Sequence, residues 1–273
     1  MKIAYTINGL IGGFSGKNSE NINNTEDHIL ILKYIGKTLE KNIAEHNDVD
    51  FFVFTWHTNL KEEMLKYLPS TTRVITISPQ IDFEVPEHLK YGDISRVKTH
   101  KSRWYGFKEV INSMSKYEVE NNFEYDLVVN ARFDICWTRP YNFSILDNTK
   151  FHIPGHRNDR HLDWGWPDRA PEIVDHVFAS SSSWMKKYST MFNHLDEYTL
   201  PGQCPQWNTI SNHFLMVWHL RKLGMLSEET VKKTFGVISD TCKEIIGGTK
   251  LSNVDYDIFR FMKLSRTEVK NKI

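Results

Sequence analysis

The sequence of 273 residues is poor in cysteine, and the few cysteines it has are scattered. Cys136, Cys204 and Cys242 are odd in number and widely separated, and none forms the Cys-x-x-Cys spacing of metal and redox sites. This pattern excludes a disulfide framework and a cysteine-based zinc site. It favours a reduced, cytoplasmic protein.

Long apolar runs and a charge excess are also missing. No stretch approaches the roughly 18 apolar residues that a membrane span needs, so we expect no transmembrane segment. The glycine-interrupted start, MKIAYTINGLIGGF, makes a poor secretory signal. The 34 Lys and Arg residues balance 34 Asp and Glu residues. Because a dedicated nucleic-acid binder normally carries a basic surplus, we expect no nucleic-acid partner.

Aromatic residues, in contrast, are abundant. The chain has 8 Trp, 11 Tyr and 16 Phe, together 13% of its residues. Aromatic rings fill protein cores, and they also stack on sugars and bases. Composition alone does not separate these two uses, so the positions of the rings have to decide.

Strand and helix patterns alternate through the first half of the chain. Apolar runs predict strands, and apolar residues at helical spacing predict the helices between them. The predicted strands are Lys2 to Ile7, Val49 to Thr55, Arg73 to Ser78 and Tyr125 to Ile135, and the predicted helices are Thr25 to Ala44, Leu60 to Leu68 and Trp104 to about Glu120. This order predicts an α/β fold with a mostly parallel central sheet flanked by helices.

The second half of the chain has a different texture. Residues 138–172 form a Pro- and Gly-containing, loop-rich insert, and long irregular segments of this kind are often functional. Two helices are predicted after it, Ser183 to Tyr198 and Asn208 to Leu223. The tail beyond Glu228 is weakly patterned, and we expect its charged end to fray. No internal repeat is present, so a single domain over residues 1–273 is the simplest organisation.

Two segments have residue types suited to phosphate or metal chemistry. The glycine-rich loop at 9–18 does not match the Walker pattern, because Ile11 and Asn18 stand where Gly and Ser or Thr are needed. It is either a flexible loop or a backbone contact to a nucleotide. Arg132 and Asp134 follow a buried apolar run, where unpaired charge would be costly. They either form an ion pair, or Asp134 binds Mg²⁺ or Mn²⁺ on a diphosphate with Arg132 near the phosphates.

Four segments in order resemble nucleotide-sugar glycosyltransferases of the GT-A type, from bacterial surface-polysaccharide and large-DNA-virus lineages. The segments, which together span about residues 1 to 200, are KIAYTINGLIGG, DVDFFVFTWHTN, SRWYGFKEVINSMSKYEVENNFEYDLVVNARFDICW and, more weakly, DHVFASSSSWMKKYSTMFNHL. The resemblance implies a Rossmann-like GT-A fold with a helical C-terminal part. It also implies a nucleotide-binding half, 1–137, and an acceptor-side half, 138–273.

The activity implied by this resemblance is transfer of a monosaccharide from a UDP- or GDP-linked donor to a glycan, lipid or protein acceptor. It would take place in the cytoplasm, or in the host cytoplasm if the chain is viral. The family's DxD metal motif reads R-F-D here, so that Asp134 matches its last carboxylate and implies a divalent cofactor, Mn²⁺ or Mg²⁺. The donor contacts carried over are Thr6, Asn8, Gly9, Trp56, Arg103, Tyr105, Arg132 and Asp134.

An inverting enzyme of this type needs a carboxylate that deprotonates the acceptor. Asp163 and Asp175 are the candidates, and Asp175 is preferred because an Asp recurs there in the resembled pattern. The alternative is a turn carboxylate without a catalytic role. Trp164 and Trp166 flank a glycine in the insert, where they would either contact the acceptor sugar or form a local hydrophobic clasp.

The histidines are open to two interpretations. His152, His156 and His161 lie either in a solvated polar loop without a specific role or in a loop that recognises the acceptor or a phosphate. His213 and His219 on the penultimate helix are either hydrogen-bonded, partly buried residues or a further metal ligand.

Two other functions compete with a glycosyltransferase. One is a sulfotransferase-like enzyme that binds phosphate with the 9–18 loop, against which the broken Walker spacing argues. The other is a non-catalytic carbohydrate-binding protein, which would explain the aromatic residues but is usually all-β.

Overall fold

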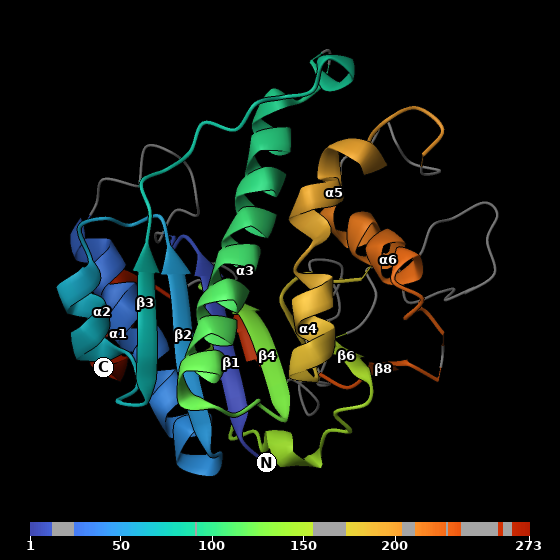
Figure 1. Cartoon of the computed structure of the whole chain (residues 1–273). Coiled ribbons are helices and arrows are strands. Elements are labelled where there is room, and N and C mark those ends of the chain that lie inside the picture. The colour runs from blue at the N-terminus through green and yellow to red at the C-terminus, as the bar shows by residue number, and fades with distance from the viewer. Residues whose placement is uncertain are drawn as a thin grey trace, which may run out of the picture.

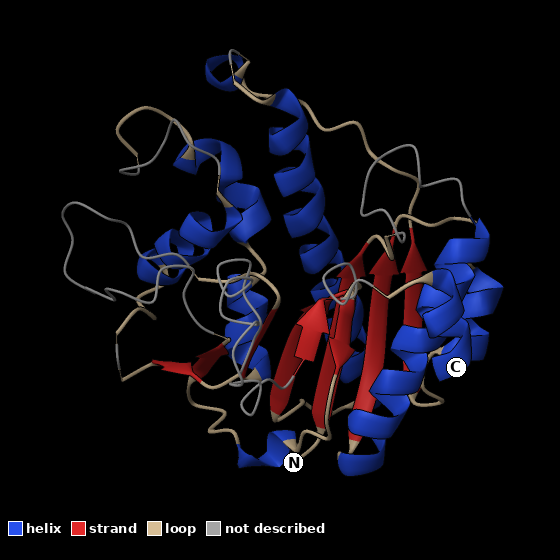
Figure 2. Ribbon diagram, turned by 180° about the vertical axis from the view of Figure 1, so that it is seen from behind, coloured by secondary structure: helices blue, strands red, loops and turns tan. Residues whose placement is uncertain are grey.

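A computed structural model describes residues 1–12, 25–90, 92–154, 173–203, 211–227, 229–235, 256–258 and 264–273. Within them a seven-stranded mixed sheet lies between two layers of helices (Figures 1 and 2). The strand order is β3-β2-β1-β4-β7-β6-β8. The bounds are β1 Ile3–Gly9, β2 Val49–Thr55, β3 Thr72–Ile77, β4 Leu127–Arg132, β6 Phe151–Ile153, β7 Val177–Ser180 and β8 Val231–Lys233.

The first four strands in the order β3-β2-β1-β4 are parallel to one another. β7 runs antiparallel to both β4 and β6, and β6 is parallel to β8. Strands of a sheet covered on both faces read as continuous apolar runs, which is why β2, VDFFVFT, is buried along its whole length. The predicted α/β class with a mostly parallel, helix-flanked sheet is confirmed. The second half of the chain supplies β6, β7 and β8 to the same sheet.

The helices divide between the two faces because successive strand residues point to opposite sides. Phe51 packs in one core with helices α1, α2 and α7, and its neighbour Phe52 packs in a second core with α3 to α6. The bounds are α1 Thr25–Asn42, α2 Lys61–Tyr67, α3 Ile94–Asn121, α4 Ser182–Tyr188, α5 Met191–Tyr198, α6 Asn212–Lys222 and α7 Arg266–Lys272. Short 3₁₀ turns are η2 Ala44–His46, η3 Glu87–Leu89 and η4 Phe143–Ile145.

Several predicted boundaries differ from the structure. The predicted strand Tyr125 to Ile135 is interrupted by a turn at residues 133–134, and β5 Ile135–Trp137 then pairs with β9 Tyr256–Ile258. The predicted helix from Ser183 to Tyr198 consists of two helices, α4 and α5. The predicted loop-rich insert contains β6. Helix α3 begins well before Trp104, at a site where the Asp93 carboxylate accepts a hydrogen bond from the backbone N–H of Arg96.

The expectation of a frayed tail is wrong for residues 264–273. Ser265 and Glu268 form a reciprocal capping box that starts α7, which satisfies two backbone N–H groups of the first turn. Val269 is fully buried against the α1 side of the sheet. The Arg266 guanidinium bridges to Glu26 at 2.6 Å and to Asp27 at 3.1 Å. Packing and ion pairing therefore hold α7 on α1.

The strand order reverses at β1. The chain moves from β1 outward to β2 and β3, and α3 then returns it to β4 on the other side of β1. Open α/β sheets bind ligands at such a switch point, at the carboxyl ends of the strands. Helix α3 has 28 residues and β1 has 7, which correspond to lengths of about 42 Å and 23 Å. The N-terminal part of α3 consequently extends past the carboxyl edge of the sheet (Figure 1).

Across the part of the chain that the structure describes, no helix has the length and apolarity that crossing a bilayer requires.

Gly36 tests the contact between α1 and α2. A Cβ at Gly36 would lie 2.0 Å from the carbonyl oxygen of Tyr67, and backbone cannot move aside as a flexible side chain can. Alanine gains about 1 kcal/mol in helix propensity over glycine, but the collision outweighs it. We expect Gly36→Ala to lower the free energy of unfolding by about 1–3 kcal/mol in urea titrations.

The matched control is Gly92→Ala, whose Cβ would meet its nearest neighbour, the carbonyl oxygen of Leu89, at an ordinary 3.5 Å. We expect a change within about 0.5 kcal/mol for this control. Equal stability of the two variants would contradict the close helix contact.

Candidate functional site

Six polar side chains meet at the switch point, and we call them the switch-point cluster. Its members are Asn8, Arg103, Asn130, Arg132, Asp134 and Asp175. They come from the carboxyl ends of β1 and β4, the turn after β4, the segment before β7, and helix α3. The side chains of both arginines and both aspartates are about nine-tenths buried or more. Charges buried this deeply require compensation, and their contacts show how it is achieved.

Arg103 is held mainly by neutral oxygen atoms. Its Nη1 donates to Oδ1 of Asn8 at 2.6 Å, and its Nη2 donates to Oδ1 of Asn130 at 3.2 Å and to the backbone oxygen of Asp175 at 3.3 Å. The Asn130 amide also donates to Oδ1 of Asn8 at 3.0 Å and to Oγ1 of Thr6 at 2.9 Å, which ties β4 to β1. These contacts fix the guanidinium between the two strand ends.

The positive charge of Arg103 is only partly compensated. The Asp175 carboxylate lies 4.0 Å from Nε of Arg103, beyond hydrogen-bond distance. Among the described residues, this Nε–H has no hydrogen-bond partner. Burial lowers the pKa of Arg103 to about 10, although Asp175 acts in the opposite direction. The guanidinium is charged at neutral pH and retains an unused donor.

Arg132, in contrast, is paired with two carboxylates. Its Nε donates to Oδ1 of Asp134 at 2.9 Å and its Nη2 to Oδ2 at 2.6 Å, which is a bidentate pair. Its Nη1 lies 3.4 Å from Oδ1 of Asp175. Burial alone would lower the pKa of Arg132, but the two aspartates outweigh it and raise the pKa. The ion-pair interpretation of the R-F-D segment is therefore confirmed.

Asp175 joins the cluster to helix α6. Its Oδ2 accepts a hydrogen bond from Nδ2 of Asn212 at 3.2 Å, and Nδ1 of His213 lies 3.9 Å from its Oδ1. Burial alone would raise the pKa of Asp175, but Arg132, followed by His213, His176 and Arg103, holds it well below its ordinary range. The carboxylate is ionised at any physiological pH. So low a pKa makes Asp175 a weak general base, and its base role stays a prediction.

The environment of Asp134 does not suit a divalent cation. Both of its carboxylate oxygens already accept hydrogen bonds from Arg132. A cation bound there would lie beside a guanidinium and be repelled by it. No group of three or more His, Cys, Asp or Glu side chains in the described residues has an arrangement that could hold a metal ion. Mg²⁺ and Mn²⁺ prefer oxygen ligands, and the described residues leave none of Asp134's oxygens without a cationic partner.

The other predicted donor residues fall into two groups. Thr6 is buried within the sheet, where its hydroxyl donates to the Val129 carbonyl at 3.1 Å, and Gly9 follows at the strand end with a φ of 117°. Trp56 and Tyr105 stack on each other, with ring centroids 5.6 Å apart and an interplanar angle of 25°. Trp56 is 7% exposed, and its indole N–H has no hydrogen-bond partner among the described residues.

The structure also places Trp104 and three of the histidines. Trp104 is fully buried, and its indole N–H donates to Oδ1 of Asn212 at 2.9 Å. His213 reaches the cluster, whereas His219 is buried against the hydroxyl of Tyr198 at 2.7 Å. His152 is buried in β6, where one ring nitrogen lies 2.6 Å from Oγ1 of Thr234.

Residues 155–172 lie outside the described part of the structure. They include the predicted catalytic Asp163, the predicted acceptor contacts Trp164 and Trp166, and the loop histidines His156 and His161.

The fold brings to the site three residues that no sequence motif marks. Asn130 is a fully buried amide directly after the apolar run Leu127 to Val129 of β4, and that break in the pattern is the signal that could have identified it. Asn212 and His176 contribute a hydrogen bond and an electrostatic effect to Asp175, respectively. Asn212 does not stand out locally, because it acts on a residue 37 positions away in the sequence, whereas His176 directly follows Asp175 and its effect there depends on burial.

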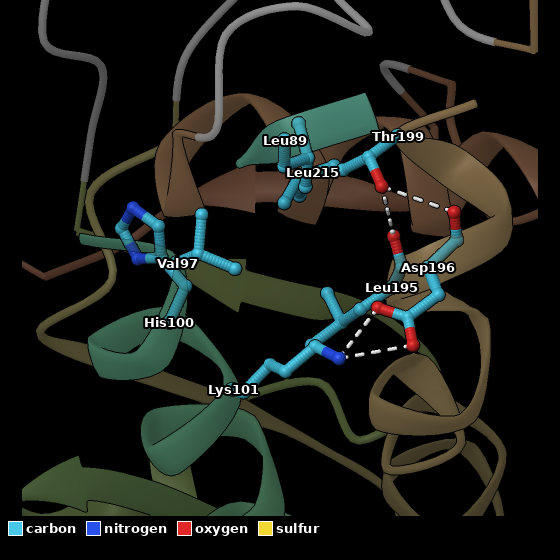
Figure 3. Close-up of a pocket in the computed structure, with 8 residues that line it drawn as sticks. All are labelled: Leu89, Val97, His100, Lys101, Leu195, Asp196, Thr199 and Leu215. Carbon is cyan, nitrogen blue, oxygen red and sulfur yellow. Dashed lines mark hydrogen bonds and ion pairs between the residues drawn. The ribbon is translucent and has the colours of Figure 1, made fainter. Parts of the chain in front are cut away.

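A small cavity lies to one side of the switch point, between η3, the start of α3, α5 and α6 (Figure 3). Its volume is about 10 Å³, which is room for one water molecule at most. Next to it the Lys101 ammonium bridges to the Asp196 carboxylate at 2.7 Å and donates to the Glu84 carbonyl at 2.7 Å. The Lys101 contacts are structural ties between α3, α5 and the segment before α3.

No protein-family model and no curated protein sequence matches the chain.

The first prediction at this site concerns acid stability. Burial, followed by the charge of Arg132, lowers the pKa of His176 to about 3, whereas an unfolded histidine titrates near 6.5. The unfolded chain therefore binds a proton that the folded chain excludes, and stability is lost as pH falls from 6.5 towards 3. We expect His176→Gln to reduce the loss in unfolding free energy between pH 7 and pH 5 by about 2 kcal/mol.

The exposed residue His46 supplies the matched control. Urea titrations of His46→Gln should show the wild-type difference between the two pH values. An unreduced pH difference in His176→Gln would show that this imidazole is not held in its neutral form.

A second prediction concerns the buried ion pairs. Asp175→Asn removes the carboxylate that Arg132 and Arg103 share, and breaking one partner of a buried pair costs about 3–5 kcal/mol. We expect the free energy of unfolding to fall by this amount. Asp82→Asn, which removes the exposed partner of Lys98, should cost less than about 1 kcal/mol. Similar small losses in both variants would mean that Asp175 is not part of the electrostatic network.

Proposed function

We propose that the chain is a glycosyltransferase that moves a monosaccharide from a UDP- or GDP-linked donor to a glycan, lipid or protein acceptor. The observation that carries the proposal is the position of Arg103. This buried guanidinium, with an unused Nε–H, stands between the ends of β1 and β4, at the switch point where α/β sheets bind their ligands. The alternation of strands and helices is compatible with the Rossmann-like fold that such an enzyme would have.

The chemistry of the site suits a nucleotide-sugar donor. Cleavage of the bond between sugar and phosphate develops negative charge on the departing diphosphate, and fixed positive charges at that position lower the barrier. Arg103 and Arg132 supply two guanidinium groups, which match phosphate oxygens in charge and in hydrogen-bond geometry. Asp175 contributes to the arrangement by its ion pair with Arg132. The role of Asp163 as general base stays a prediction.

The aromatic pair offers a place for the base. Tyr105 lies two residues after Arg103 on α3 and stacks on Trp56 from the end of β2. The buried indole N–H of Trp56 lacks a partner in the described residues, so a carbonyl oxygen on a uracil or guanine ring could satisfy it.

The test is a binding screen by thermal shift. We expect UDP or GDP to raise the melting temperature of the full chain, whereas CMP, adenine nucleotides and uridine do not. We expect Trp56→Phe, which removes the indole N–H, to weaken UDP or GDP binding by about tenfold. The control is Trp184→Phe, because Trp184 is a partly buried tryptophan on α4.

Each contrary outcome identifies a competing function. Selective stabilisation by an adenosine phosphosulfate would replace the proposal with a sulfotransferase-like enzyme. Stabilisation by free sugars with no response to any nucleotide would favour a carbohydrate-binding protein, although the α/β sheet differs from the usual all-β architecture of such modules.

A further inference from the structure

We propose that Arg103 takes the place of a divalent cation in this site, so that the nucleoside diphosphate binds without a metal ion. This inference rests on the proposed function and specifies how the donor's charge is met. It follows from the unequal charge compensation in the switch-point cluster, from the rigid mounting of Arg103, and from the poor fit of a cation at Asp134.

The two arginines of the cluster differ in what surrounds them. Arg132 is bonded to Asp134 through two nitrogens and approaches Asp175 with a third. Arg103 is bonded to two amide oxygens and one backbone oxygen, and its nearest carboxylate is 4.0 Å away. A phosphate oxygen at hydrogen-bond distance would come closer to Arg103 than Asp175 does. A phosphate group is therefore attracted more strongly by Arg103 than by Arg132, whose charge two carboxylates already compensate.

The Arg103 guanidinium is also preorganised, because protein groups fix its orientation before any ligand binds. Asn8 accepts from its Nη1 and donates through Nδ2 to the Arg103 backbone oxygen at 3.1 Å, which fixes both ends of the residue. Asn130 braces the other side of the guanidinium. The Nε–H is left without a partner in the part of the chain described here. A buried donor that lacks an acceptor is costly unless a ligand completes it.

A divalent cation at Asp134, in contrast, would find no free carboxylate oxygen and a positive charge beside it. It would have to displace Arg132 from both carboxylate oxygens and would then lie beside the displaced guanidinium. Asp175 already neutralises part of the same two arginines. Both carboxylates of the cluster are thus engaged with arginines, which leaves the guanidinium groups to meet the charge of the proposed diphosphate.

The experiment is isothermal titration of the full chain with UDP and GDP, first in EDTA and then in excess MnCl₂. We expect the dissociation constants in the two buffers to agree within about twofold. Arg103→Gln should weaken binding by about tenfold to a hundredfold, as expected for loss of a charged hydrogen bond. The affinity of Arg103→Lys should lie between those of the wild type and Arg103→Gln, because lysine keeps the positive charge but lacks the planar guanidinium with its several N–H donors.

Two further variants make the result decisive. Arg73→Gln is the matched control, because this arginine on β3 is bonded to Asp50 away from the switch point, and we expect wild-type binding. Asp134→Asn removes a negative charge from the cluster and leaves the arginines in excess, so we expect tighter nucleotide binding in EDTA. If Asp134 held a metal ion, Asp134→Asn would instead weaken nucleotide binding, because the cation would lose its carboxylate ligand.

The outcomes separate the two proposals. Binding that appears only with MnCl₂ and disappears in Asp134→Asn would overturn the role of Arg103 while leaving the proposed function standing. Failure of the wild-type chain to bind either nucleotide in both buffers would reject the proposed function itself. If Arg103→Gln does not fold, as judged by circular dichroism, the wild-type buffer comparison and Asp134→Asn still decide the question.

Discussion

Four buried charges at the carboxyl end of the sheet constrain the rest of the structure. Arg103, Arg132, Asp134 and Asp175 are all withdrawn from water, and each would be costly there without partners. Their compensation requires the turn after β4, the segment before β7 and the middle of α3 to meet within hydrogen-bond distance. The strand order provides this meeting point, because α3 has to pass the ends of β2 and β1 before the chain enters β4.

The same network accounts for the chemistry that we propose. The cluster contains equal numbers of positive and negative groups, but its contacts distribute them unevenly between the two arginines. Amide oxygens orient a guanidinium without cancelling its charge, so Arg103 remains an electrostatic site for an anion. Such fixed charge needs no reorganisation when a ligand arrives, which is the property that makes oriented groups effective in catalysis.

Sequence patterns predicted the parts of the fold in which neighbouring residues share one environment. Strand β2 was predicted at its observed bounds, because it is buried on both faces and reads as an apolar run. The start of α3 was missed, because its polar first turns extend past the sheet and carry little apolar periodicity. The strand through Ile135 was predicted as continuous, because β4 and β5 are both apolar and the turn between them has no glycine or proline.

The sequence by itself determined the α/β class, the mostly parallel sheet and the residue types available at its carboxyl edge, because periodicity and composition are local properties. A resemblance also offered Asn8, Arg103, Arg132, Asp134 and Asp175 as candidate site residues, a role that stays a prediction. Only the tertiary structure decided that Asp134 is bonded to Arg132 and that Arg103 is held by amides. The pairing of Arg103 with Asn8 joins residues 95 positions apart in the chain, and no local pattern records such a contact. Arg132 and Asp134 are only two positions apart, but their spacing left open whether they bind each other or a ligand.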